Sequence, residues 1–192
     1  MAFLAAITLT CTATSPYNYT LDCASFSKPA GWTAPSTCDL EGDWTKIIER
    51  PLPSWYADMK LGIFIHWGVY SVPSFGSEWY WHGVTCSPDG PQANFQNRAY
   101  GKNFEYPEFA PQFKAELFDA AAWAKTIKAS GAQYVLPVAK HHDGFAMWNA
   151  TATTPGWNAV ELGPKRDVLA ELYEATQAAG IDWGIYFSQG EW

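Results

Sequence analysis

Residues Tyr134–Asn149, with the sequence YVLPVAKHHDGFAMWN, decide the fold class. Their first six residues form an apolar, partly β-branched run, which is typical of a buried β-strand. A cation, two imidazoles and a carboxylate follow directly, in Lys140, His141, His142 and Asp143, and a glycine then permits a turn. In α/β proteins, polar loops at the ends of buried strands carry chemistry on a rigid base. We therefore interpret this stretch as a strand that ends in a functional site.

Two helices are predicted from apolar periodicity and from their end signals. Residues 118–127 repeat apolar side chains at helical spacing, with Asp119 as N-cap and Gly131 as the stop. The same pattern returns after Asp167, with Gly180 as the stop. On this second helix, one face is predicted to comprise Leu169, Leu172, Tyr173 and Thr176.

Strands are predicted at residues 61–65, 134–139 and 183–188. The second and third each follow a helix and a glycine, and such repeats predict a parallel sheet. Residues 69–114, rich in proline, glycine and aromatic residues, are predicted to be loop-rich. The expected fold class is α/β: the first three strands of an incomplete (β/α)8-type barrel, because a whole barrel takes about 250 residues. A small three-layer domain is the alternative, but it would leave a sheet edge uncovered.

Composition restricts the partners. Among the 192 residues the net charge is −7, which argues against nucleic-acid binding, and no apolar run approaches the length of a membrane span. Residues 1–44, rich in Thr, Ser, Pro and Cys, are predicted to be an irregular extension with disulfides; four cysteines allow two bonds and three pairings. Sequons at Asn18 and Asn149, together with an apolar N-terminal stretch, favour a secretory route.

The predicted strand ends gather polar and aromatic groups. His66 follows the first strand, Tyr186 and Ser188 lie on the third, and the loop after the first strand adds Glu78 and Trp79. Imidazole and carboxylate groups can hydrogen-bond hydroxyls, and rings can cover an apolar C–H face. This combination predicts a pocket for a small polyhydroxylated ligand.

Metal binding is the competing interpretation of the same residues. Its ligand types would be His66, His141, His142 and Asp143. Adjacent histidines on an extended strand point to opposite sides, so both rarely bind one ion. A serine nucleophile is disfavoured because the chain has no GxSxG motif.

Six motifs follow one another along the chain: GIFIHWG at 62–68, EWY at 78–80, FAPQFKAE at 109–116, KHHDGF at 140–145, GPKRD at 163–167 and GIYFS at 184–188. In this order they resemble the α-L-fucosidases of glycoside hydrolase family 29. The resemblance covers roughly residues 45–192 and implies a β/α-barrel catalytic domain. It also implies retaining, exo-acting hydrolysis of terminal α-L-fucose from fucosylated oligosaccharides or glycoproteins.

The resemblance further implies the residue roles. Those implied to contact fucose are His66, Glu78, Trp79, His141, His142 and Tyr186. Glu78 is also a candidate accessory to acid/base chemistry. The nucleophile and the main acid/base are expected beyond Trp192, so the catalytic residues are unknown within this chain. No cofactor and no metal is expected, and oligomeric state is left open.

The leading interpretation is therefore the N-terminal part of an α-L-fucosidase, inactive by itself, in a secreted or lysosome-like compartment. A non-catalytic sugar-binding remnant is the first alternative. A metal-dependent hydrolase that uses the histidine cluster is the second.

Overall fold

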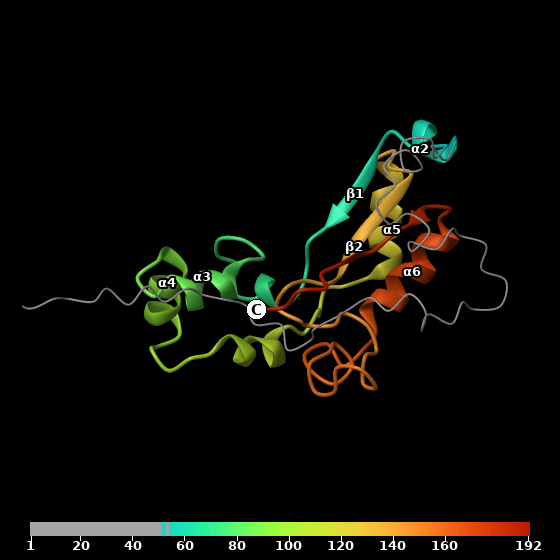
Figure 1. Cartoon of the computed structure of the whole chain (residues 1–192). Coiled ribbons are helices and arrows are strands. Elements are labelled where there is room, and N and C mark those ends of the chain that lie inside the picture. Colours follow the sequence, from blue (N-terminus) through green and yellow to red (C-terminus); the bar gives the residue numbers. More distant parts are fainter. Residues whose placement is uncertain (1–50, 53) are drawn as a thin grey trace, which may run out of the picture. The chain divides into compact units, whose positions relative to one another are not determined.

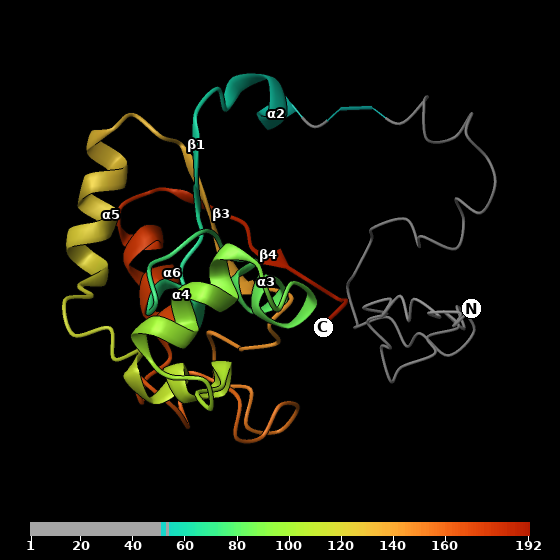
Figure 2. The same ribbon diagram turned by 90° about the vertical axis from the view of Figure 1, so that its left-hand side faces the viewer.

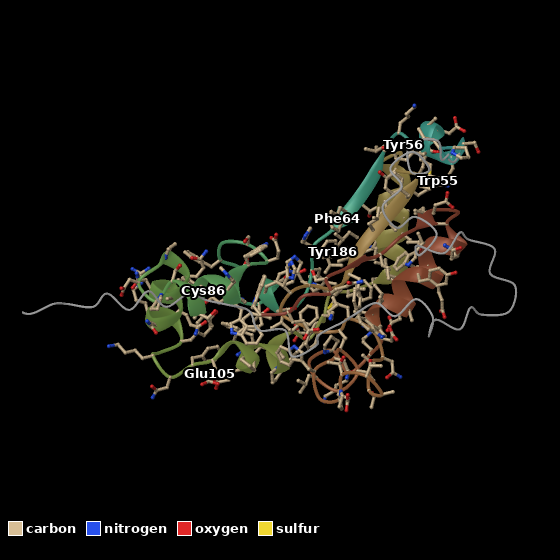
Figure 3. All side chains as sticks on the ribbon, in the orientation of Figure 1. Trp55, Tyr56, Phe64, Cys86, Glu105 and Tyr186 are labelled. Carbon is tan, nitrogen blue, oxygen red and sulfur yellow. The ribbon has the colours of Figure 1, made fainter. Side chains whose placement is uncertain are left out.

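The computed structural model describes residues 51–52 and 54–192. The extension expected over residues 1–44, with three of the four cysteines and the Asn18 sequon, lies outside the described residues. Of the described residues, Lys60–Trp192 belong to one compact unit. Helix α2 (Ser54–Asp58) belongs to a second unit, within which the rings of Trp55 and Tyr56 meet edge to face with centroids 6.0 Å apart (Figure 3).

The larger unit contains a parallel sheet (Figure 1). Its strands are β1 (Gly62–Ile65), β2 (Tyr134–Lys140), β3 (Asp182–Trp183) and β4 (Tyr186–Phe187). Strand β1 pairs with β2, and β3 and β4 pair in turn with the first and second halves of β2. The predicted parallel pairing is confirmed, and the structure places β2 between β1 and the pair β3 and β4.

The third predicted strand, residues 183–188, is two short strands, β3 and β4, in the structure. Strand β3 pairs with Tyr134 and Val135, and β4 pairs with Val138 and Lys140. The gap between them falls beside Pro137, which has no N–H to donate to a ladder. A proline in a central strand therefore leaves two short strands in place of one continuous strand.

Gly62 allows β1 to approach β2 closely. It is the register partner of Tyr134. A Cβ atom at position 62 would lie 2.1 Å from ring atoms of Tyr134, far inside van der Waals contact. The glycine therefore makes room for the tyrosine ring where the two strands pair.

Helices α5 (Ala120–Ala129) and α6 (Val168–Ala178) lie on the same side of the sheet (Figures 1 and 2). The predicted N-caps are confirmed: a carboxylate oxygen of Asp119 accepts from the N–H of Ala122 at 2.9 Å, and one of Asp167 accepts from Ala170 at 2.8 Å. A small apolar core joins these helices to the sheet and comprises Ala124, Ile127, Ala132, Val135 and Ile181. The predicted apolar face of α6 is wrong at Tyr173, which is 45% exposed.

The long segment between β1 and β2 contains four short helices, so the prediction of a loop-rich region is wrong over them. They are η3 (Val69–Ser71), α3 (Tyr80–Cys86), α4 (Pro91–Ala99) and η4 (Tyr106–Gln112). Pro91 occupies the first position of α4, where a proline is compatible with a helix. Their buried aromatic residues build a second, larger core, which includes Tyr80, Tyr106 and Phe109.

No helix among residues 51–52 and 54–192 has the length and apolar character that crossing a bilayer requires.

Candidate functional site

The candidate site lies at the C-terminal ends of the parallel strands. His66 directly follows β1, His141 and His142 directly follow β2, and Tyr186 begins β4. Because parallel strands end at the same edge of a sheet, their terminal side chains gather there. Three segments that are far apart in sequence therefore contribute to one place.

The rings of three predicted site residues form one cluster. His141 stacks on Tyr186 at a centroid distance of 5.5 Å and an interplanar angle of 20°, and His66 lies 5.8 Å from His141 and 6.2 Å from Tyr186. Phe64 extends the cluster along β1, 5.6 Å from Tyr186 (Figure 3). The hydroxyl of Tyr186 accepts a hydrogen bond from Ser188 at 3.0 Å, which orients the phenol.

Glu78 completes a polar group with two of these histidines. One ligand atom from each of His66, Glu78 and His141 lies within 4.8 Å of the other two. Glu78 belongs to the segment between β1 and β2, so that segment folds back to the strand ends. This arrangement matches the expected position of the loop that carries Glu78 and Trp79.

Two indole rings, Trp79 and Trp192, lie beside the second histidine, His142, and His82 lies beside both of them. Trp192 lies 4.7 Å from both Trp79 and His142, and 5.3 Å from His82. Trp79 is 5.5 Å from His142 and is 45% exposed. A partly exposed indole among packed rings offers a flat apolar surface with a polar edge. The predicted site residues Trp79 and His142 therefore lie together, beside the polar group.

His141 is the most buried histidine of the site, with 3% of its surface exposed. Burial, reinforced by the neighbouring His142 and partly opposed by Glu78, lowers the pKa of His141 to about 4. The imidazole is therefore neutral at pH 5 and above, with one nitrogen donating and the other accepting. Its Nδ1 atom is buried and has no hydrogen-bond partner among the described residues.

Asp143 is buried, and both of its carboxylate oxygens accept hydrogen bonds from the protein, so it is not available as a metal ligand. It is 4% exposed, its Oδ2 accepts from the hydroxyl of Tyr106 at 2.7 Å, and its Oδ1 accepts from the N–H of Phe145 at 3.2 Å. Burial raises its pKa to about 6, although both hydrogen bonds oppose the shift. The interpretation of Asp143 as a possible metal ligand is therefore wrong. Its carboxylate is structural and fixes the turn after β2.

His142, which was also considered as a metal ligand, does not lie with the other candidate ligands. Its Nδ1 contacts the carbonyl oxygen of Gly190 at 2.6 Å, and it is not in the three-residue group. Lys140 is occupied as well: its ammonium pairs with Glu191 and lies 4.6 Å from the ring centroid of Phe187. Of the four residues considered as metal ligands, the structure brings together two, His66 and His141, and it adds Glu78 to them.

Sequence reasoning missed three residues near the site: Tyr70, His82 and Trp192. Tyr70 is buried, and its ring lies 5.8 Å from that of His141. Burial, with the nearby negative charges of Asp143 and Glu78, raises its pKa above the usual value. A signal existed only for His82, which lies three residues after Trp79 and therefore shares a helical face with it.

The comparisons with known proteins agree in pointing to one family. A family model described as alpha-L-fucosidase matches residues 31–192. Tissue alpha-L-fucosidase of Rattus norvegicus is 42% identical over 166 residues, covering 86% of this chain and 35% of the relative. Alpha-L-fucosidase of Dictyostelium discoideum is 43% identical over 155 residues, covering 78% of this chain and 33% of the relative.

Solved structures share the fold. The structure of Thermotoga maritima alpha-fucosidase in complex with fucose matches with a TM-score of 0.71 and 40% sequence identity, over 78% of this chain and 37% of that chain. The chain thus spans about a third of the length of the relatives that it matches.

Proposed function

Because the chain belongs to the alpha-L-fucosidase family, glycoside hydrolase family 29, we propose that it holds the fucose-binding part of a retaining, exo-acting α-L-fucosidase. The observation that carries this proposal is the convergence of His66, Glu78 and His141 at the ends of two neighbouring strands. One charged acceptor and two imidazoles suit a ligand with several hydroxyl groups.

The spacing of the three ligand atoms suits a hydroxyl oxygen. At their limiting separation of 4.8 Å, a shared atom in their plane would lie about 2.8 Å from each, which is hydrogen-bond length.

The rings beside this polar group serve the apolar side of the ligand. Trp79 and His142 lie 5.5 Å apart, and Tyr186 stacks on His141. In this proposal the rings pack against the C–H face of fucose. The site residues thus keep the roles that the family resemblance implies: His66, Glu78, Trp79, His141, His142 and Tyr186.

Retaining hydrolysis requires two carboxyl groups about 5–5.5 Å apart, one as nucleophile and one as acid/base. We place both in the two thirds of the relatives' length that this chain does not match, with Glu78 as an accessory group. Strands β1 and β2, with β3 and β4 taken as one divided strand, then represent the first three strands of a (β/α)8 barrel, and the catalytic domain is assigned to residues 45–192. The substrates are terminal α-L-fucosides of oligosaccharides or glycoproteins.

A secretory or lysosome-like location accompanies this function. Cys86 is disulfide-bonded, and disulfides persist in oxidising compartments. Some relatives carry the names tissue and plasma alpha-L-fucosidase.

Hydrolysis of an aryl α-L-fucoside tests the proposal. The residues of this chain would replace the matching third of a related full-length enzyme, and the chimera would be compared with its His141→Ala variant. The lost hydrogen bonds predict a fall in kcat/KM of roughly tenfold to a hundredfold. Glu174→Gln, on the exposed face of α6, is the matched control and should leave kcat/KM unchanged. A chimera that folds but does not hydrolyse the fucoside would favour a sugar-binding remnant.

A metal-dependent hydrolase is the second candidate, because His66, Glu78 and His141 are also zinc-ligand types. Zinc holds nitrogen ligands at about 2.0–2.1 Å, so tetrahedral ligand atoms lie roughly 3.4 Å apart. Ligand atoms that lie within 4.8 Å of one another are compatible with this geometry. Stoichiometric zinc found by elemental analysis of the purified protein would favour this candidate over the sugar site.

A further inference from the structure

The loop between β2 and α6 contains the sequence Asn149-Ala150-Thr151, followed by Ala152. This is an Asn-X-Thr acceptor sequence in which X is not proline. This acceptor sequence belongs neither to the proposed fucose site nor to the sets of residues that make up the two cores. Its side chains alternate in burial: Asn149 and Thr151 are exposed, and Ala150 is 2% exposed. The loop is thus anchored through its middle residue, and both functional side chains face solvent.

The asparagine side chain is held in a defined orientation. Its Oδ1 accepts hydrogen bonds from the hydroxyl of Thr151 at 3.0 Å and from the Thr151 N–H at 3.5 Å. Asn149 as a whole is exposed, and no hydrogen bond from its amide Nδ2 to another described residue is found. The backbone N–H of Asn149 donates to Asp167, the N-cap of α6, at 2.9 Å. The exposed asparagine is therefore held at a fixed backbone position.

A second observation concerns the compartment. Cys86 is disulfide-bonded, and its partner lies outside the described residues. Disulfides form and persist in the secretory route, where N-glycosylation also takes place. The sequence motif, the exposed geometry and the oxidised cysteine are independent features that agree.

We propose that Asn149 is an N-glycosylation site and carries a glycan attached through N-acetylglucosamine. The donor is a lipid-diphosphate-linked oligosaccharide. Nδ2 of Asn149 forms a bond to the anomeric carbon, the bond from that carbon to the diphosphate oxygen breaks, and the lipid diphosphate leaves with the electron pair. One Nδ2 proton is released to a base. The folded chain accommodates the product because the side chain of Asn149 already lies in solvent. This inference rests on the proposed secretory location, and not on fucose binding.

The test is site mapping on protein secreted by a eukaryotic host, with a host leader sequence so that passage through the secretory route is assured. Peptide N-glycosidase in ¹⁸O-water converts a glycosylated asparagine into labelled aspartate, which mass spectrometry locates. We expect most copies of the Asn149 peptide to be labelled. Secreted, disulfide-bonded protein with unlabelled Asn149 would overturn the proposal.

Matched variants separate the motif from general effects on folding. Thr151→Ala and Asn149→Gln should both abolish the labelled peptide, whereas Thr151→Ser should keep it. Thr153→Ala alters a neighbouring threonine outside the motif and should leave occupancy unchanged. The other sequon, at Asn18, is scored on its own peptide, so a glycan there cannot be mistaken for one at Asn149. Labelling of Asn149 that persists in Thr151→Ala would also count against the proposal, because it would reflect deamidation.

Discussion

The hydroxyl of Tyr106 donates a 2.7 Å hydrogen bond to Oδ2 of Asp143, two residues after His141. The bond connects the helical segment between β1 and β2 to the turn that follows β2. Both side chains are buried, at 2% and 4% exposure. The segment that carries Glu78 is thereby tied to the turn that carries the two adjacent histidines.

Tyr106→Phe should destabilise the protein, because it removes a hydrogen bond to a buried carboxylate while keeping the ring. We expect a loss of about 1–3 kcal/mol in the free energy of unfolding, measured by urea denaturation. The loss should be larger at pH 7 than at pH 5, since the bond favours the ionised form of Asp143, whose pKa is about 6. Tyr100→Phe, at a partly exposed position, is the control. Equal, small losses in both variants would contradict this role of Tyr106.

Asp143 and His141 should make opposite contributions to the pH dependence of stability. The pKa of Asp143 is raised to about 6, so its contribution is present at low pH and is lost as the pH rises through 6. The pKa of His141 is lowered to about 4, so its contribution is present above pH 6.5 and is lost as the pH falls through 4. In the wild type the two partly cancel.

Single variants should expose each contribution between pH 4 and 6.5. Asp143→Asn leaves the histidine, so its stability should fall with decreasing pH, by on the order of 2 kcal/mol. His141→Gln leaves the carboxylate, so its stability should rise with decreasing pH by a similar amount. Urea denaturation at several pH values measures both slopes. Three parallel curves for the wild type and the two variants would exclude this explanation.

Gly62→Ala should disturb the pairing of β1 with β2. The new methyl group would lie 2.1 Å from ring atoms of Tyr134, so that ring must move. We expect a loss of about 1–3 kcal/mol, the usual cost of overpacking. Adding Tyr134→Ala should remove most of this extra loss in a double-mutant cycle. Gly190→Ala, which meets no atom within 4 Å, is the control. A neutral Gly62→Ala would show that the strands tolerate the added volume.

Local interactions explain how much of the fold could be predicted. The caps of α5 and α6 depend on Asp119 and Asp167, each bonded to a residue three positions later, so the sequence alone contains the signal. Parallel pairing follows from the helix–glycine–strand repeat. The short helices between β1 and β2 were missed because prolines there mark helix starts as well as loops, as at Pro91.

The site could also be predicted only in part, because some of its contacts join residues that are far apart in the sequence. His66, His141 and Tyr186 could be predicted because each lies on or just after a predicted strand. The bond between Tyr106 and Asp143 joins residues 37 positions apart and leaves no periodic trace in the sequence. The contacts of Trp192 with Trp79 and His142 depend on tertiary packing in the same way. Residue types were therefore sufficient to propose the pocket, and insufficient to identify all the residues around it.

The most direct test of the central claim is a titration of the protein with L-fucose, followed through the imidazole ¹⁵N signals of its four histidines. The account predicts saturable shifts at His66 and His141, larger than at His82, which lies in the aromatic group and outside the polar group. Glu78→Gln should weaken these shifts, and Glu174→Gln should not. The mirror-image sugar, D-fucose, should leave the signals in place. Histidine signals that do not move with L-fucose, or that move equally with both enantiomers, would contradict a fucose site at these strand ends.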